Sequence, residues 1–296
     1  MDDKVVRIAY ATDMGLVGPT ALSLDSAIRV TPSLRHVDIL ACSLDSDAVD
    51  LFRRVASEGN VSLTLHPMGD EMFETARHKG RHVPKTALAR MFLPGIVDGR
   101  VLYIDGDTLI RRDLAPLFAS ELDGKLIGGV RDYGVLAGLH RISRGKDWAY
   151  RTQTEAVISP YPTDDYINSG VLIMDCAEIR REKLDEAMVQ FERATGYRTV
   201  DQDFLNELFK GRVKYLNPAW NASWGRASWQ RGQISRHGHG GTEIRQEKTG
   251  IYHFHGPAKP WHSLSMDMWR RDPICIATYK IALNKFRKRY PDVTFG

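Results

Sequence analysis

The chain has 296 residues, of which 43% are hydrophobic and 26% are charged, a composition typical of globular proteins. Its formal net charge of +4 suits an anionic ligand but is smaller than nucleic-acid-binding proteins usually carry, so no nucleic acid partner is expected. Cys42, Cys176 and Cys275 are odd in number and widely spaced, which argues against a disulfide framework or zinc finger and indicates a reducing compartment. With neither a secretory leader nor a membrane-spanning stretch predicted, we expect a cytoplasmic protein.

Predicted strands and helices alternate along the chain. In the first part, strands are predicted at 5–11, 36–42 and 61–66, and helices at 18–30 and 46–58. Further on, strands are predicted at 101–104, 126–130, 165–175, 213–216 and 251–255, and helices at 85–93, 113–118, 183–193 and 201–209. This alternation predicts an α/β fold whose mostly parallel central sheet is covered by helices on both faces.

Two segments do not follow this alternation. Residues 217–241 are rich in Trp, Gly, Asn and Ser, and we expect a functional loop there because the segment is too long for a simple connection. Trp220, Trp224 and Trp229 could offer flat faces to a saccharide acceptor, although burial in the core is the alternative. The stretch 279–290 is basic with spaced apolar residues, which is typical of a helix that touches an anionic membrane surface or of a solvated final helix.

The decapeptide 101–110 reads VLYIDGDTLI, and its apolar run ends in Asp105, Gly106 and Asp107. Residues i and i+2 of a strand point the same way, so both carboxylates can face one point beyond the edge of the sheet where ligands bind. A divalent cation such as Mn²⁺ or Mg²⁺ would relieve their mutual repulsion. The alternative is an Asp-Gly turn between two strands.

A second cluster occupies residues 251–262, which read IYHFHGPAKPWH. His253 and His255 are also at i and i+2, and one imidazole could complete a metal site begun by carboxylates. Gly256 allows the backbone to approach a ligand closely, and Lys259 offers a point charge for a phosphate. The alternative is a turn with a buried tryptophan and surface histidines.

Weaker candidates follow other predicted strands. Thr12 and Asp13 come after the first strand, where Asp13 could hold a ribose hydroxyl or bond its own backbone. Neither a GxGxxG nor a P-loop motif occurs, so phosphates would be held mainly by metal, lysine and glycine backbone. The remaining polar candidates are Asp132, Asn168 and the helix start at Asp201, Gln202 and Asp203. Each either faces a ligand or has a structural role, as a helix cap or as a group bonded within the core.

Together these motifs resemble glycosyltransferase family 8, the retaining enzymes of GT-A fold that include bacterial lipopolysaccharide galactosyl- and glucosyltransferases. The likeness covers nearly the whole chain, from residue 8 to residue 262, with the motifs in the family's order. The matching residues are Ala11-Thr12-Asp13, Arg90, YIDGDTLI, Asn168-Ser169-Gly170-Val171-Leu172, DQDFLN and HFHGPAKPWH.

The resemblance implies a single Rossmann-like, nucleotide-sugar-binding GT-A domain at residues 1–262 and a basic helical tail at 263–296. It implies retaining transfer of galactose or glucose from a UDP-hexose to a saccharide or glycolipid acceptor, in cell-surface polysaccharide or lipopolysaccharide synthesis. A cytoplasmic enzyme at the inner face of a membrane would fit this role, with the basic tail as the candidate membrane contact.

The resemblance also implies roles for individual residues. Asp105, Asp107 and His253 would hold Mn²⁺ (or Mg²⁺). For donor binding, the resemblance implies that Ala11, Thr12 and Asp13 contact the nucleoside and that Gly256 and Lys259 contact the diphosphate. It also implies that Asp105 and Gly106 take part in donor binding. The residues implied around the transferred sugar are Arg90, Asp132, Asn168, Gln202 and Asp203.

The base-stacking partner, the route to retention and the class of reaction each have alternatives. Relatives of the galactosyltransferases often carry Asn-Tyr where this chain has Gly15-Leu16, so no partner for base stacking is identified. Retention of configuration requires either a nucleophile, for which Gln202 and Asp203 are candidates, or attack from the leaving-group face. The sequence DGDTL also looks like the signature of haloacid-dehalogenase phosphatases, but that signature normally lies near the N-terminus and about a hundred residues precede it here. A third alternative is a carbohydrate-binding protein that kept the fold without catalytic turnover.

Overall fold

In the computed structural model the described residues are 5–74, 76, 85–194, 197–262, 268 and 271–295. The parts of the predicted tail at 263–267, 269–270 and 296 lie outside them.

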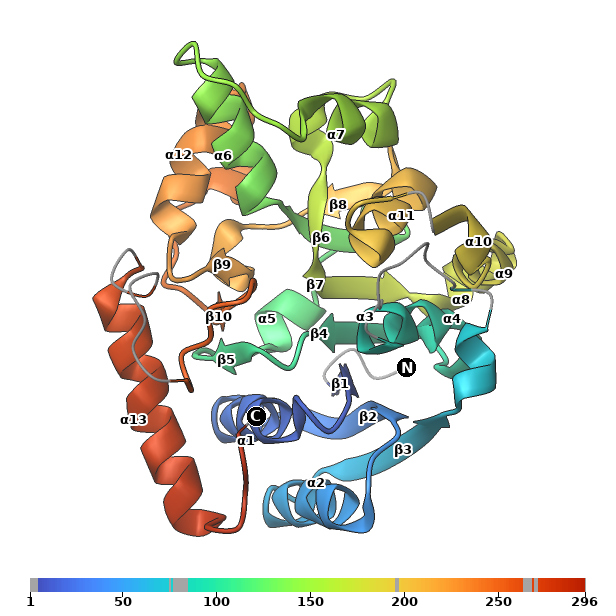
Figure 1. Ribbon diagram of the computed structural model, residues 1–296, viewed down its shortest axis with the longest axis vertical. Helices are drawn as coiled ribbons and strands as arrows, with labels where there is room; N and C mark the ends of the chain where they lie inside the picture. Colours follow the sequence, from blue (N-terminus) through green and yellow to red (C-terminus); the bar gives the residue numbers. More distant parts are fainter. Residues whose placement is uncertain are drawn as a thin grey trace.

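A seven-stranded sheet forms the centre of the molecule (Figure 1). Its strands are β1 (Val6–Thr12), β2 (Leu34–Cys42), β3 (Ser62–Met68), β4 (Arg100–Ile104), β6 (Ile127–Arg131), β7 (Ile167–Asp175) and β8 (Val213–Tyr215). They lie in the order β3-β2-β1-β4-β7-β6-β8, and of these strands only β7 runs antiparallel to its neighbours. The predicted α/β fold with a mostly parallel central sheet is confirmed.

Helices cover both faces of this sheet. One face packs against α1 (Val17–Val30), α2 (Ser46–Glu58), α5 (Ala115–Phe118) and α13 (Pro273–Arg289). The other face packs against α3 (Lys85–Ala89), α4 (Leu93–Ile96), α8 (Cys176–Arg181), α9 (Leu184–Met188), α10 (Phe191–Ala194) and α11 (Val200–Phe209). The short 3-10 helices are η1 (Asp70–Phe73), η2 (Arg90–Phe92), η3 (Thr163–Asp165), η4 (Pro218–Trp220) and η5 (Gly241–Ile244).

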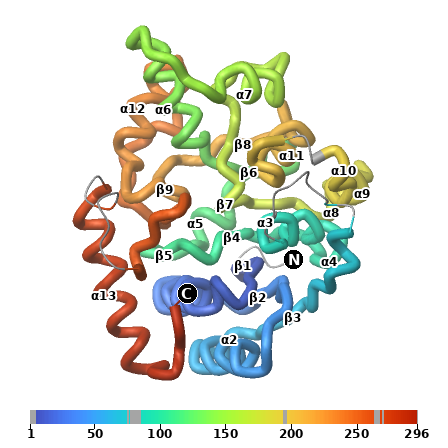
Figure 2. The backbone as a smooth tube through the Cα atoms, in the orientation of Figure 1, coloured from blue at the N-terminus to red at the C-terminus, as the bar shows by residue number. Residues whose placement is uncertain are grey.

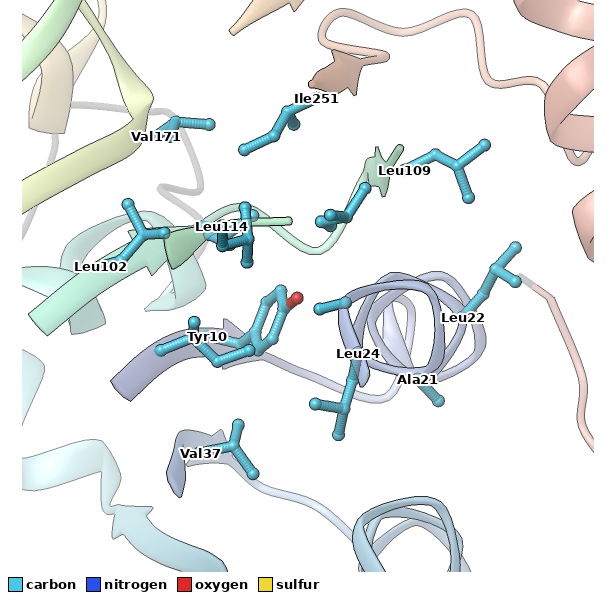
Figure 3. Packing of buried hydrophobic residues seen from close by; sticks show 14 of the residues in the cluster. Tyr10, Ala21, Leu22, Leu24, Val37, Leu102, Leu109, Leu114, Val171 and Ile251 are labelled. Carbon is cyan, nitrogen blue, oxygen red and sulfur yellow. The ribbon is translucent and has the colours of Figure 1, made fainter. Parts of the chain in front are cut away.

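Alternation along β1 shows how the sequence supplies two apolar faces. Ile8 and Tyr10 belong to the cluster on the α1 side, whereas Ala9 and Ala11 belong to the cluster on the α11 side, as the period of two in a strand requires. Figure 3 shows Tyr10 in the first cluster, packed between β4 and helix α1. Both clusters are continuous across several strands, so the sheet is the structural core on which the strand ends are positioned.

A second, three-stranded sheet consists of β5 (Thr108–Ile110), β10 (Ile251–His253) and β9 (Ala222–Ser223), with β10 in the middle. Strand β5 pairs antiparallel with β10, and β9 pairs parallel with it. The decapeptide VLYIDGDTLI is therefore divided between the two sheets. Asp105, Gly106 and Asp107 form the link between them, and the pairing of β5 with β10 brings residues 251–253 to this link.

The segment 217–241 is not the loop that its composition predicts. It contains η4, β9 and the helix α12 (Ala227–Arg236). Trp220 and Trp224 are 6% and 0% exposed in the core, so the expectation that they face an acceptor is wrong, and the core alternative holds. Trp229 is half-buried in α12 and packs against Tyr133, with 4.9 Å between ring centroids.

Other element boundaries also differ from the predictions. The helix predicted at 183–193 is divided into α9 and α10, and the helix predicted at 85–93 is divided into α3, η2 and α4. Two helices that were not predicted, α6 (Tyr133–Ile142) and α7 (Arg151–Ile158), lie beyond strands β6 and β8, at the end of the molecule opposite α2 (Figure 1).

Helix α13 lies along the edge of the molecule, and the chain after it returns to α1 (Figure 2). Tyr279, Leu283 and Phe286 are buried in the core cluster on the α1 side, and Arg289 pairs with Asp25 of α1 at 2.5 Å. The tail is thus packed on the rest of the chain, while a domain boundary near residue 262 stays a prediction. Among the described residues no helix combines the length and the apolar character needed to cross a membrane.

A buried ion pair ties β1 to β2 and leads to a stability prediction. Asp38 is fully buried and accepts hydrogen bonds from Arg7 Nε at 2.6 Å and Arg7 Nη2 at 2.9 Å. Burial opposes ionisation of Asp38, but Arg7 and His66 outweigh it and hold the pKa of the carboxyl below its usual value. We expect Asp38→Asn to lower the free energy of unfolding at pH 7 by about 2 kcal/mol.

The pH dependence of this effect has a definite sign. A carboxyl with a lowered pKa in the folded state stabilises the fold above its unfolded pKa, about 4, and loses that contribution as the pH falls through the folded pKa. The stability gap between the native protein and Asp38→Asn should therefore narrow in urea unfolding below about pH 4. Asp50→Asn, at an exposed carboxylate paired with Arg53, is the control and should change little. A gap that is constant from pH 7 to pH 3 would contradict the assignment.

Candidate functional site

The ends of several strands meet at one edge of the central sheet. Strands β1, β4 and β6 finish there, which places Thr12, Asp105 and Asp132 along this edge. Strand β7 runs in the opposite direction, so its beginning, with Asn168 and Gly170, lies at the same edge. The backbone N–H of Asp105 donates to the carbonyl of Gly170 at 2.7 Å, which fixes the start of the Asp-Gly-Asp link against β7.

Asp105, Asp107 and His253 converge at this link. One ligand atom from each lies within 4.8 Å of the others. His253 Nε2 is 3.2 Å from Asp107 Oδ1 and 3.6 Å from Asp105 Oδ2, and the imidazole is almost fully buried. Two carboxylate oxygens and an imidazole nitrogen are donors that suit Mn²⁺, so these residues fit a divalent cation.

Each carboxylate presents only one of its oxygens to His253. The other oxygen of Asp105, Oδ1, accepts a hydrogen bond from Tyr103 Oη at 2.7 Å. The other oxygen of Asp107, Oδ2, accepts from Lys259 Nζ at 2.5 Å. Burial disfavours the charge on Asp107, but His253 and Lys259 outweigh it and hold the pKa of Asp107 well below its usual range. Both carboxylates are therefore oriented by protein groups on the side away from the shared point.

A chain of hydrogen bonds fixes the orientation of His253. Its Nδ1 lies 2.8 Å from Asn221 Oδ1, and Asn221 Nδ2 donates to Asn168 Oδ1 at 2.9 Å. Asn168 Oδ1 also accepts from the backbone N–H of Gly170, and Asn168 Nδ2 donates to Asp132 Oδ2 at 3.1 Å. The backbone N–H of Gly170 can only donate and the ionised carboxylate of Asp132 can only accept, which determines how the side-chain amide of Asn168 is oriented. The amide of Asn221 is oriented in turn by its bond to Asn168. His253 Nδ1 then carries a proton, and Nε2 faces the two aspartates, where it would give up its own proton to ligate a cation.

The other histidine of the motif has a different environment. His255 Nε2 lies 2.7 Å from Ser223 Oγ, outside the group formed with the aspartates. Burial, together with the neighbouring His253, lowers the pKa of His255 to about 4, so this imidazole is neutral at pH 7. The geometry therefore distinguishes the two histidines that the spacing alone left equivalent.

Arg90 connects the aspartate link to helix α11. Its Nη2 is 3.0 Å from Asp105 Oδ1 and 3.5 Å from Asp201 Oδ2, and its Nη1 donates to the carbonyl of Ser169 at 2.6 Å. The guanidinium also lies over the ring of Tyr103, at 4.6 Å from the centroid. Burial disfavours its charge, but Asp105 and the other acidic neighbours raise the pKa of Arg90, which stays cationic.

Gln202 and Asp203 are adjacent in sequence but bond to different partners. Gln202 Oε1 accepts from Asn168 Nδ2 and from the backbone N–H of Ser169, both at 3.1 Å, so Gln202 belongs to the site cluster. The buried carboxylate of Asp203 accepts from Tyr166 Oη and from the backbone N–H of Thr199. The role predicted for Asp203 at the sugar stays a prediction, made less favourable by these bonds.

The loop after β1 shows the local bonding that the sequence left as an alternative. Asp13 Oδ1 accepts from the backbone N–H of Gly15 at 3.0 Å. Thr12 is buried, and its Oγ1 accepts from Thr20 Oγ1 at 3.1 Å. The implied contacts of Ala11, Thr12 and Asp13 to a nucleoside stay predictions.

Close packing explains two glycines of the site. A Cβ on Gly106 would lie 2.0 Å from Thr20 Oγ1 of α1. A Cβ on Gly170 would lie 2.3 Å from His253 Cε1 and 2.6 Å from Asp105 Oδ2. Gly256 differs, because its φ of +92° lies in the left-handed region that favours glycine, in open space. The implied donor contacts of Gly106 and Gly256 stay predictions.

The sequence did not identify Tyr103, Gly170 or Asn221 as candidates, and it gave Asp201 only as a residue that caps a helix or faces a ligand. Tyr103 had a signal, since it precedes Asp105 by two residues in a strand and so points to the same side. Gly170 and Asp201 stood inside motifs that were already singled out. Asn221 had no signal, because its place depends on the pairing of β9 with β10, about thirty residues away.

Comparison with known proteins gives one family. The sequence model described as "Glycosyl transferase family 8" matches residues 7–265. A lipopolysaccharide 1,2-glucosyltransferase of Escherichia coli (strain K12) is 23% identical over 95% of this chain and 78% of that protein. General stress protein A of Bacillus subtilis (strain 168) is 27% identical over 64% of this chain and 63% of that protein, so the match spans less than two thirds of this relative.

Solved structures agree on the fold. The galactosyltransferase LgtC, crystallised with donor and acceptor sugar analogues, is similar with a TM-score of 0.70, 23% identity, and coverage of 95% of this chain and 96% of that chain. The glycosyltransferase GlyE of Streptococcus pneumoniae TIGR4 is similar with a TM-score of 0.60, 18% identity, and coverage of 97% and 64%. These likenesses confirm the predicted GT-A fold.

Proposed function

The chain belongs to glycosyltransferase family 8, and from this premise we propose that it is a retaining, metal-dependent hexosyltransferase using a UDP-sugar donor. The transferred sugar is galactose or glucose, and the acceptor is a saccharide in cell-surface polysaccharide or lipopolysaccharide synthesis. One observation carries the proposal: Asp105, Asp107 and His253 each present a single ligand atom to one shared point, with their other polar atoms held by the protein. Two of the relatives, a glucosyltransferase and a galactosyltransferase, support the choice of hexose.

We assign the roles of the residues as follows. Asp105, Asp107 and His253 would hold Mn²⁺ or Mg²⁺, which when bound neutralises charge on the leaving diphosphate. Lys259, beside Asp107, and the backbone at Gly256 would hold the phosphates, while Ala11, Thr12, Asp13 and Gly106 would line the nucleoside side. Arg90, Asp132, Asn168 and Gln202 would surround the sugar. The bonded carboxylate of Asp203 favours Gln202 as the side chain that faces the ring, and both routes to retention stay open.

The test is release of UDP from a panel of UDP-sugars in the presence of Mn²⁺, together with calorimetric binding of UDP, GDP and CMP. We expect UDP to bind tightest and UDP-glucose or UDP-galactose to turn over. Tighter binding of GDP or CMP would contradict the donor assignment. Hydrolysis of phosphomonoesters without UDP release would support the phosphatase alternative, and sugar binding without turnover would support a carbohydrate-binding protein.

The hydrogen-bond chain to His253 leads to a prediction at Asn221. Asn221→Leu keeps the volume but removes the acceptor for His253 Nδ1, so the imidazole loses the bond that fixes its orientation. Electron paramagnetic resonance titration should show Mn²⁺ affinity reduced about 10- to 100-fold. Asn221→Asp keeps an oxygen acceptor and should lose much less. Asn217→Leu, at a buried asparagine of the same segment that bonds Ala219, Thr242 and Arg245, is the control for loss of stability. Equal Mn²⁺ affinity in Asn221→Leu and the native protein would exclude this role.

We also propose a cytoplasmic location at the inner face of a membrane, with residues 1–262 as the catalytic domain and a glycolipid as carrier of the acceptor. Leu283 and Phe286 of the tail are buried, which leaves Ile281, 57% exposed, beside Lys285 and Lys288 as the candidate contact. Co-sedimentation with anionic vesicles should therefore fall in a Lys285→Glu and Lys288→Glu double variant. Equal sedimentation of the native protein and the double variant would contradict the proposed membrane contact.

A further inference from the structure

A cavity of about 1140 Å³ lies between α6, α7 and the start of α11. Asp132 and Gln202 form part of its wall, and both belong to the hydrogen-bonded cluster described above. A molecule that fills the cavity therefore ends at the proposed sugar position. This volume is slightly above the range of about 300–1,000 Å³ that is usual for ligand pockets, which leaves room for an extended ligand.

The charges around this cavity are unbalanced. Four basic side chains line it, and they are Arg141, Lys146, Arg151 and Arg198. Three carboxylates also line it, and they are Asp132, Asp147 and Asp203. The hydrogen bonds that Asp132 and Asp203 accept come from neutral donors, which do not neutralise a carboxylate, so the lining has a formal excess of one positive charge. The excess of cations favours a ligand that carries negative charge.

Aromatic rings stand next to these cations. Trp148 lies directly on α6, because a Cβ on Gly138 would be 2.3 Å from its indole ring. The guanidinium carbon of Arg198 is 3.2 Å from the centroid of the Tyr150 ring. Aromatic faces pack against the apolar faces of sugar rings, and a guanidinium bonds carboxylate or phosphate with two parallel hydrogen bonds.

From the cavity, its charges and its aromatic rings, we propose that the acceptor is an acidic saccharide, bearing a carboxylate or a phosphate, and that it binds in this cavity with its reacting hydroxyl toward Gln202. This rests on the proposed function, because it takes Gln202 to face the transferred sugar. Trp148 and Tyr150 pack against sugar rings, and Arg151 and Arg198 pair with the acidic group. Arg151, which now pairs with Glu155 on the surface, is free to exchange that partner for the ligand at small cost.

The experiment is calorimetry on protein loaded with UDP and Mn²⁺, using three trisaccharides that differ only in the last residue. That residue is glucose, glucuronate or 6-phosphoglucose, so the three arms distinguish a neutral ligand, a carboxylate and a phosphate. We expect at least one acidic trisaccharide to bind about tenfold or more tightly than the neutral one, as hydrogen bonds to charged groups allow. Arg198→Gln and Arg151→Gln should each reduce this ratio, and Trp148→Ala should weaken all three.

Arg53→Gln is the control, because Arg53 is an exposed arginine on α2 at the far end of the molecule from α6 and α7 (Figure 1). It should leave the acidic-to-neutral ratio unchanged. Equal binding of the three trisaccharides, binding of none, or a ratio unaffected by both Arg151→Gln and Arg198→Gln would overturn the acceptor proposal. Failure of the native protein to bind UDP and Mn²⁺ in the loading step would instead count against the proposed function. Unchanged UDP binding in each variant shows that it is folded.

Discussion

Asp107→Asn is expected to abolish Mn²⁺-dependent UDP binding and to lower sugar transfer by about 10³-fold, while the fold remains intact. The substitution keeps the shape of the side chain and removes its charge. Asp107 Oδ1 faces His253 Nε2 at 3.2 Å, whereas Oδ2 is held by Lys259. The variant therefore weakens both the cation site and the position of the lysine assigned to the diphosphate.

The decisive measurement is the transfer rate after chelation and after Mn²⁺ is restored, in the native protein and in Asp107→Asn. Asp113→Asn is a matched control, since Asp113 is an exposed carboxylate that accepts a hydrogen bond from the backbone N–H of Ala115. We expect His253→Ala to resemble Asp107→Asn and Asp105→Asn to be milder. Full activity of the native protein in chelator, or a fully active Asp107→Asn, would show that the Asp-Gly-Asp link is only a turn.

The sequence predicted the metal-ligand candidates because their signals are local. Asp105 and Asp107 follow an apolar run at the end of a strand, and His253 ends another, so strand parity and the rule that ligands meet strand ends apply directly. The antiparallel direction of β7 could not be seen in this way. That direction is the reason Asn168 and Gly170 lie at the same edge as the ends of β4 and β6.

The loop predicted at 217–241 is wrong for a different physical reason. Its Gly, Asn and Ser content is typical of loops, yet Trp220 and Trp224 supply enough apolar surface to bury it, and burial outweighs local propensity. The same folding places Asn221 next to His253, a contact set by strand pairing rather than by spacing in the sequence. Because helices α6 and α7 were not predicted from the sequence, the cavity that they border could not be predicted either.

Gly170→Ala should lower transfer by about 100-fold, although it adds only one methyl group and removes no functional side chain. The new Cβ would lie 2.3 Å from His253 Cε1 and 2.6 Å from Asp105 Oδ2, distances at which atoms must move apart. The backbone of Gly170 cannot yield easily, because its carbonyl accepts from Asp105 and its N–H donates to Asn168 Oδ1. We therefore expect His253 and Asp105 to be displaced, which separates the ligand atoms of the cation site.

The loss should appear as weaker Mn²⁺ binding in paramagnetic resonance titration, accompanied by a decrease in unfolding free energy of about 1–3 kcal/mol from overpacking. Gly232→Ala is the control, because a Cβ there meets nothing within 4 Å and alanine is the better helix former in α12. That variant should keep full transfer and gain slight stability. If Gly170→Ala binds Mn²⁺ with the affinity of the native protein, then the added methyl group does not displace His253 and Asp105 enough to matter. In that case the close convergence of these side chains does not determine the affinity for the cation.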